Sequence, residues 1–196
     1  MTSPQDIQVE RLFVTSLHRA IEELAPEEID VFSRWFDPST RRMRFHVATI
    51  IGAVGYLRRN PALYQKIIEA AGKTASERAY ADLSQIERRL LEALPRFGRE
   101  RLVKYLLHSG LRSIHKDAQL SVGKDGDKLI LTVTNSIFCC TPADNSGHRC
   151  QFYAALFEGL LGKTDLRRYK VKEASCRGQG ADACRFEALL EEPQAA

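Results

Sequence analysis

Three cysteines and a glutamate late in the sequence have the residue types of a metal site. They are Cys150, Glu173, Cys176 and Cys184. Zinc in proteins favours four ligands in a tetrahedron and takes them from cysteine sulfur, histidine nitrogen and carboxylate oxygen. The loop between Cys176 and Cys184 contains two glycines, so it can bend sharply and return one thiol to the other. Because the sequence has no CxxC pair, the spacing leaves two alternatives open: a zinc site and ordinary buried thiols.

Each of these four residues has a basic neighbour in the sequence, which favours the zinc site. The neighbours are Arg149, Lys172, Arg177 and Arg185. Three thiolates and a carboxylate on a divalent cation leave a negative centre, and nearby cations stabilise such a centre. The competing explanation is chance, because 29 of the 196 residues are lysine or arginine.

Other candidate ligands nearby are interpreted differently. Cys139 and Cys140 are adjacent, so their side chains point in different directions and rarely share a metal ion; we interpret them as structural buried thiols. His148 is close to Cys150 and is a spare ligand, but a solvated residue at the start of a helix is the favoured interpretation.

The predicted elements around the four residues place them suitably for a ligand. A helical pattern over residues 148–161 puts Cys150 in the first turn, where the helix dipole favours an anion. Residues 168–174 alternate as a strand does, and Glu173 lies on the apolar face of that strand. A carboxylate on an apolar face needs a partner, which a metal ion would supply. Cys184 lies on one face of a last strand.

The hydrophobic pattern changes its period along the chain, and this change predicts an α+β fold. Residues 1–114 are helix-rich, and residues 115–190 contain a small antiparallel sheet with a packed helix and the zinc site. Residues 191–196 form a polar tail. Alternation around an Asp-Gly turn predicts a β-hairpin over residues 118–133. The segment 31–47 is compatible with either a hairpin or a helix.

Local signals set the expected limits of the helices. Helices are expected over residues 6–24, 47–57, 61–70, 74–83, 84–94 and 99–114. Gly72 is expected to interrupt the helical pattern, and Gly162 is expected to end the helix that begins near His148. Gly52 and Gly55 suggest a small-residue face that another backbone approaches, and residues 84–87 have the spacing of a capping box.

The pattern Cys150…Glu173-x-x-Cys176-x7-Cys184-Arg185-Phe186, with Phe157-Glu158-Gly159-Leu160-Leu161 between, resembles the vinyl-4-reductase domain family. This family includes sensing domains of phenol-responsive regulators, bacteriochlorophyll 4-vinyl reductase-type proteins and, distantly, TRAPP small subunits. In the regulator branch, the matching three cysteines and the glutamate bind zinc beside a pocket for an aromatic ligand. The match is specific over residues 115–190, and residues 94–106 are more loosely similar to the bacteriochlorophyll branch.

Composition and missing motifs restrict the classes of function. A net charge of +4, spread along the chain, gives no nucleic-acid footprint. No apolar run reaches membrane-span length and no secretory signal is visible, so the cysteines are interpreted as cytoplasmic thiols. The sequence has no dinucleotide fingerprint, phosphate loop or nucleophile elbow, and we assign no catalytic residue. Zinc with protein ligands alone would be structural.

The resemblance therefore implies a binding protein for an apolar aromatic molecule. The bacteriochlorophyll branch suggests a tetrapyrrole precursor, which the protein would deliver to a biosynthetic enzyme. The alternatives are a 4-vinyl reductase, which needs a hydride source, and a phenol or hydrocarbon sensor. The TRAPP branch implies a scaffold, and the many apolar helical faces predict a homodimer. A stand-alone transcription activator is not expected, because the chain lacks the ATPase and DNA-binding domains of the regulators.

Overall fold

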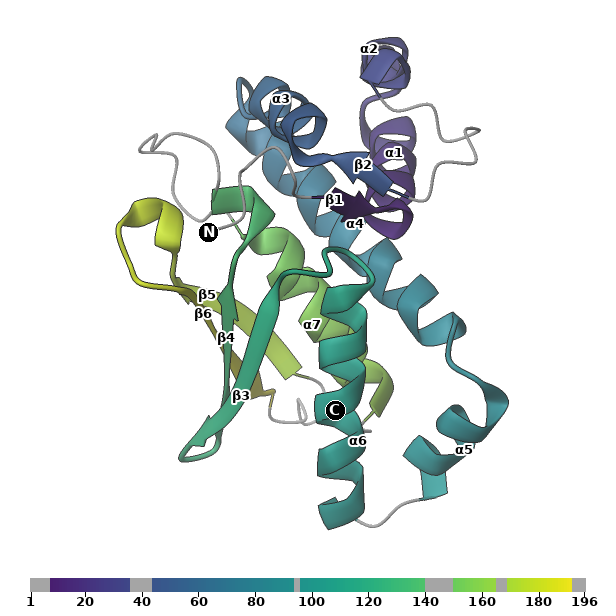
Figure 1. Cartoon of the computed structure of the whole chain (residues 1–196), viewed down its shortest axis with the longest axis vertical. Coiled ribbons are helices and arrows are strands. Elements are labelled where there is room, and N and C mark those ends of the chain that lie inside the picture. The colour runs from purple at the N-terminus through teal and green to yellow at the C-terminus, as the bar shows by residue number, and fades with distance from the viewer. Residues whose placement is uncertain (1–7, 36–43, 94–95, 140–149, 165–168, 192–196) are drawn as a thin grey trace, which may run out of the picture.

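The computed structural model describes residues 8–35, 44–93, 96–139, 150–164 and 169–191 (Figure 1). These residues form an α+β fold, as the sequence predicts. The helices are α1 (Arg11–Leu24), α2 (Ile29–Trp35), α3 (Val47–Leu57), α4 (Pro61–Ala81), α5 (Gln85–Ala93), α6 (Arg96–Arg112) and α7 (Gln151–Thr164). Three short 3-10 turns accompany them: η2 (Pro26–Glu28), η3 (Ile137–Cys139) and η4 (Arg177–Gln179). One continuous core joins the helices and the sheet.

Four antiparallel strands form the main sheet in the order β3-β4-β6-β5. Their bounds are β3 (Gln119–Asp125), β4 (Lys128–Thr134), β5 (Tyr169–Ser175) and β6 (Cys184–Leu190). The predicted hairpin is confirmed as β3 and β4, and β6 then pairs with β4 so that Val133 lies opposite Cys184. A separate two-stranded sheet joins β1 (Gln8–Glu10) to β2 (Arg44–His46).

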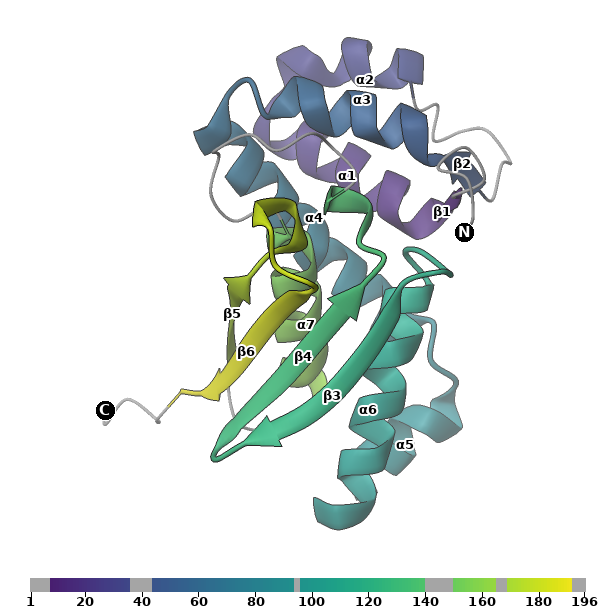
Figure 2. The same cartoon turned by 60° about the vertical axis from the view of Figure 1, so that its left-hand side comes forward.

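Helix α7 packs between the sheet and α4 (Figure 2). Its contact with α4 is close because glycines lie where the two helices meet. A Cβ atom at Gly72 would come within 2.5 Å of the carbonyl oxygen of Phe152, and one at Gly159 would collide with Ser76. The expected interruption at Gly72 is therefore wrong: packing against α7 stabilises a continuous α4 and outweighs the low helix propensity of glycine.

Three further local expectations are settled by the structure. Segment 31–47 is no hairpin, since α2 covers residues up to Trp35 and β2 pairs with β1. Gly162 does not end α7, which continues to Thr164, and the Thr164 hydroxyl donates to the carbonyl of Leu161. A Cβ atom at Gly52 or Gly55 would have no neighbour within 4 Å, so no backbone approaches there. The capping box is confirmed by reciprocal hydrogen bonds between Ser84 and Glu87.

Candidate metal centre

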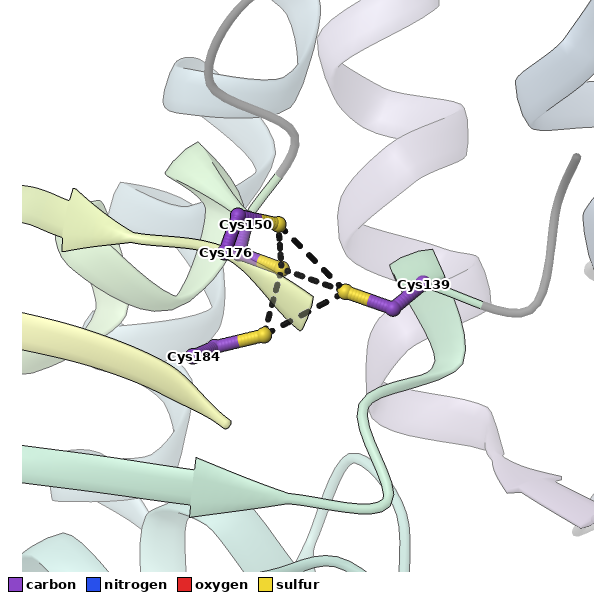
Figure 3. Close-up of side chains that lie close together, drawn as sticks. All are labelled: Cys139, Cys150, Cys176 and Cys184. Atoms are coloured by element: carbon purple, nitrogen blue, oxygen red, sulfur yellow. Dashed lines mark hydrogen bonds between the residues drawn. The ribbon is translucent and has the colours of Figure 1, made fainter. Parts of the chain in front are cut away.

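Four thiols from four different segments converge at one end of the sheet (Figure 3). Cys150 precedes α7, and its carbonyl accepts the first hydrogen bond of that helix from Tyr153. Cys176 directly follows β5, and Cys184 is the first residue of β6. Cys139 is the last residue of η3, which follows β4. The cluster thus joins α7 to three strands or their extensions.

The separations of the sulfur atoms suit a single ion. The Sγ–Sγ distances run from 3.2 Å, between Cys139 and Cys184, to 3.8 Å, between Cys150 and Cys176. All four sulfurs lie within 4.8 Å of one another. A tetrahedral zinc with Zn–S bonds of about 2.3 Å requires thiolates about 3.8 Å apart. The four thiols therefore fit one tetrahedral ion after small outward shifts, whereas a cluster of several irons would need them further apart.

Of the four residues predicted as ligands, the structure places three in this cluster. Cys150, Cys176 and Cys184 are 0%, 1% and 0% exposed. Glu173 lies at the edge: it is 7% exposed, and its Oε2 accepts a hydrogen bond of 3.0 Å from the backbone N–H of Cys150. The fourth corner is occupied by Cys139, which the sequence analysis interpreted as a structural thiol only.

Sequence reasoning missed Cys139 because the pairing that brings it close is not local. Cys139 lies five residues beyond the end of β4, and Cys184 starts β6 opposite Val133 near that end. The two cysteines are 45 residues apart in sequence, and only the β4–β6 register brings them together. A cysteine shortly after a predicted inner strand is the signal that would have identified it.

Hydrogen bonds among the thiols distribute charge unevenly when no ion is bound. Bonds from Cys150, Cys176 and Cys184 lower the pKa of Cys139 below its ordinary value. The bond to Cys139 raises the pKa of Cys150, and burial of Cys150 raises it further. A bound cation would displace the protons that the remaining thiols retain.

The cation nearest to this centre in the described residues is not one of the sequence neighbours. Lys172 and Arg177 are not buried in the centre, and Arg185 lies on the outer face of the sheet, 3.7 Å from Asp125. Arg149 lies outside the described residues. Arg58, at the end of α3, instead donates from Nη2 to the carbonyl oxygen of Phe138, the residue before Cys139, at 3.2 Å.

A cluster of aromatic rings packs directly behind the four thiols. This aromatic cluster consists of Phe13, Phe138, Phe152, Tyr153, Phe157 and Phe186, from α1, η3, α7 and β6. Ring centroids of neighbouring members are 5.0 to 6.4 Å apart, and each ring is at most 1% exposed. The hydroxyl of Tyr153 is buried among them without a hydrogen bond to the described residues, and burial raises its pKa.

Three surface pockets in the described part of the chain differ from this cluster in chemistry. A pocket of about 320 Å³ between α4, α7 and β5 reaches Glu173 and is lined by ion-paired side chains such as Lys170 and Glu158. Two others, of about 580 and 500 Å³, share Arg112 and Lys116. Charged linings of this kind do not suit an apolar ligand.

Comparison with known proteins identifies one domain and a shared fold. Residues 129–190 match the vinyl-4-reductase domain family. No curated protein matches the chain. The phenol-responsive sensory domain of the transcription activator PoxR, solved with phenol, is 12% identical with a TM-score of 0.50, and 77% of each chain is covered.

Two structures of an H-NOX protein from S. oneidensis have the same fold over nearly the whole chain. The Fe(II)NO state is 11% identical with a TM-score of 0.57, and covers 93% of this chain and 99% of the other. The Fe(II) state of a triple mutant gives the same identity and TM-score, with 94% and 97% covered. At these identities the likeness concerns the fold alone. None of the described helices has the length and apolar composition of a membrane span.

Proposed function

We propose that this chain, through the vinyl-4-reductase domain at residues 129–190, binds a small apolar aromatic molecule without transforming it. The observation that carries the proposal is the direct connection between the aromatic cluster and the candidate metal centre. Phe138 precedes Cys139, Phe152 and Tyr153 follow Cys150, and Phe186 lies just beyond Cys184. The same turns and strand ends that present the thiols therefore also present the rings.

The metal that we propose is one zinc ion with a structural role. Cysteine sulfur is a preferred donor for zinc, and four protein ligands leave no position for water or substrate. A bound zinc would cross-link η3, α7, β5 and β6, and so hold the aromatic cluster in shape. We place the protein in the cytoplasm, because the described cysteines are free and thiols persist in a reducing compartment.

The packing of the aromatic cluster favours a ligand of about one ring. Neighbouring rings are already in contact, so a single-ring guest needs one side chain, such as Phe138 on its short turn, to move aside. The solved structure of the PoxR sensory domain contains phenol, which is a ligand of this size. The Tyr153 hydroxyl offers such a ligand a polar partner inside an apolar environment.

A tetrapyrrole precursor remains the finer proposal from the sequence resemblance to the bacteriochlorophyll branch, with the chain in an accessory or delivery role for a biosynthetic enzyme. A ligand of that size requires α1 to separate from α7, because Phe13 and Phe152 have ring centroids only 5.0 Å apart. A vinyl reductase would in addition need a hydride source from a second component.

The test is calorimetric titration of the purified chain with phenol, toluene and a divinyl chlorophyllide. Trp35 is a poor reporter, because it packs on Phe32 and Tyr56 and not on the aromatic cluster. We expect phenol to bind, and we expect Tyr153→Phe to weaken phenol about tenfold while leaving toluene unchanged, since one hydrogen bond is lost. Tyr56→Phe is the matched control, because that hydroxyl donates to Glu28 away from the cluster.

Each result decides between the alternatives. Binding of the chlorophyllide alone would make the tetrapyrrole the ligand. Reduction of its vinyl group in the presence of reduced nicotinamide, followed by mass spectrometry, would make the chain a reductase and overturn the proposal. The absence of binding by all three compounds would also overturn it.

A further inference from the structure

We propose that the metal centre has five donors for four positions, and that Cys139 and Glu173 are exchangeable at the fourth. The inference rests on the metal of the proposed function and not on its aromatic ligand. The four thiols complete a tetrahedron as the structure stands. Glu173 is a buried carboxylate beside the same centre, and carboxylate oxygen is also a zinc donor.

Three of the thiols are held far more firmly than the fourth. Cys150, Cys176 and Cys184 are fully buried and adjoin α7, β5 and β6, which pack against one another. Cys139 is only half-buried and belongs to a three-residue turn that follows an irregular stretch after β4. If one ligand leaves the ion without disturbing the sheet, it is therefore Cys139.

A β-bulge directs Glu173 toward the centre. Residues three apart on a regular strand point to opposite faces, so Glu173 and Cys176 would normally diverge. The pairing of β5 with β6 shifts register between Glu173 and Ser175, and this bulge brings both side chains to the buried side. The carboxylate already accepts a hydrogen bond from the backbone N–H of Cys150, so an oxygen donor lies beside one of the three firmly held cysteines.

The exchange leaves the charge of the centre unchanged. Four thiolates on a divalent cation carry a net charge of −2, and three thiolates with one carboxylate carry the same charge. The released Cys139 thiolate takes up a proton, and the lost sulfur bond is replaced by an oxygen bond. No oxidant or reductant is required.

Arg58 and Phe138 determine which donor is bound, because they position η3. The guanidinium of Arg58 bonds the Phe138 carbonyl, and the Phe138 ring packs on Phe13 and Tyr153. Weakening either contact lets η3 move away and favours Glu173. Arg58 is thus a positioning residue, and a guest that displaces the Phe138 ring would act in the same direction.

Cobalt(II) in place of zinc tests the exchange, because its thiolate charge-transfer absorption reports how many sulfurs are bound. The wild type should show four thiolates. Cys139→Ala should still bind one cobalt, with this absorption reduced by roughly one quarter, as three sulfurs and the Glu173 carboxylate remain. Glu173→Gln keeps an oxygen acceptor for the Cys150 N–H and should retain four thiolates.

The double variant Cys139→Ala/Glu173→Gln closes the cycle. Its cobalt affinity, measured by competition with a chromogenic chelator, should fall at least tenfold further than the product of the two single effects, because each donor substitutes for the other. Arg58→Gln should shift the spectrum toward three thiolates, whereas Arg59→Gln, whose guanidinium lies over Tyr56, should not.

Several results would overturn the inference. They are a wild type that binds no cobalt, a Cys139→Ala protein that loses the ion completely or fails to fold, and single effects that simply add in the double variant. If phenol binds normally in any of these cases, the proposed ligand-binding function stands while the exchange falls. If no aromatic compound binds but the cycle is non-additive, the reverse holds.

Discussion

The carboxylate of Glu173 accepts a hydrogen bond from the backbone N–H of Cys150 at 3.0 Å, and this bond ties strand β5 to the residue just before helix α7. It satisfies one of the N–H groups that a helix start leaves without an intrahelical partner. It also places a negative charge at the positive end of the α7 dipole. Glu173 therefore has a structural role in the metal-free protein, independent of any role as a ligand.

Loss of a firmly held thiol should release the metal and destabilise the fold. We expect Cys184→Ala to abolish stoichiometric metal binding and to lower the free energy of unfolding by several kcal/mol. The binding energy of a structural zinc contributes to folding and reaches about 10 kcal/mol in small domains. Metal analysis and urea unfolding, with and without a chelator, measure both effects. Cys140→Ala is the comparison and should retain the ion; loss of metal there with retention in Cys184→Ala would refute the assigned cluster.

The α4–α7 contact should not tolerate a side chain at Gly72. A Cβ atom there would meet the Phe152 carbonyl at 2.5 Å and the Ala155 Cβ at 2.8 Å, so the helices must separate. We expect Gly72→Ala to destabilise the protein by about 1–3 kcal/mol in chemical denaturation. Gly52→Ala is the matched helical control, has open space, and should stabilise by up to about 1 kcal/mol. Equal effects of the two substitutions would contradict this account of the packing.

His115 should make the protein less stable in mild acid. Its side chain is 1% exposed, and burial lowers its pKa from the ordinary value of 6.5, against the opposing effects of Asp117 and Glu10. Below pH 6.5 the unfolded chain therefore binds a proton that the folded chain refuses, so stability falls as the pH drops toward the folded pKa. His115→Leu should flatten this part of the curve of unfolding free energy against pH. An unchanged slope would show that His115 is not responsible.

Self-association is expected through α5 and α6. Ile86, Leu90 and Tyr105 are 72%, 43% and 52% exposed, so these helices present apolar surface that a second copy could cover. We expect light scattering to give a dimer at micromolar concentration and Ile86→Glu to give a monomer with an unchanged circular dichroism spectrum. A monomeric wild type at high micromolar concentration would rule out the dimer.

Local patterns in the sequence were sufficient for some elements and not for others. The β3–β4 hairpin and the capping box of α5 follow from neighbouring residues, and both are confirmed. The interruption expected at Gly72 was wrong because the effect of this glycine depends on α7, some eighty residues away. The position of Cys139 depends on the β4–β6 register, and the direction of Glu173 depends on a bulge that no local pattern marks. Long-range pairing therefore accounts for the part of the site that sequence reasoning did not reach.

The strand order has a consequence for synthesis of the protein on the ribosome. β6 is made last of the four strands, yet it lies inside the sheet between β4 and β5. Until residues 184–190 have emerged, β4 exposes an unpaired edge to other nascent chains, and the cysteine cluster lacks one member. Premature termination just before Cys184 would thus leave a chain with nearly all of its residues but neither a completed sheet nor a completed metal centre, which suits it for recognition by cellular quality control.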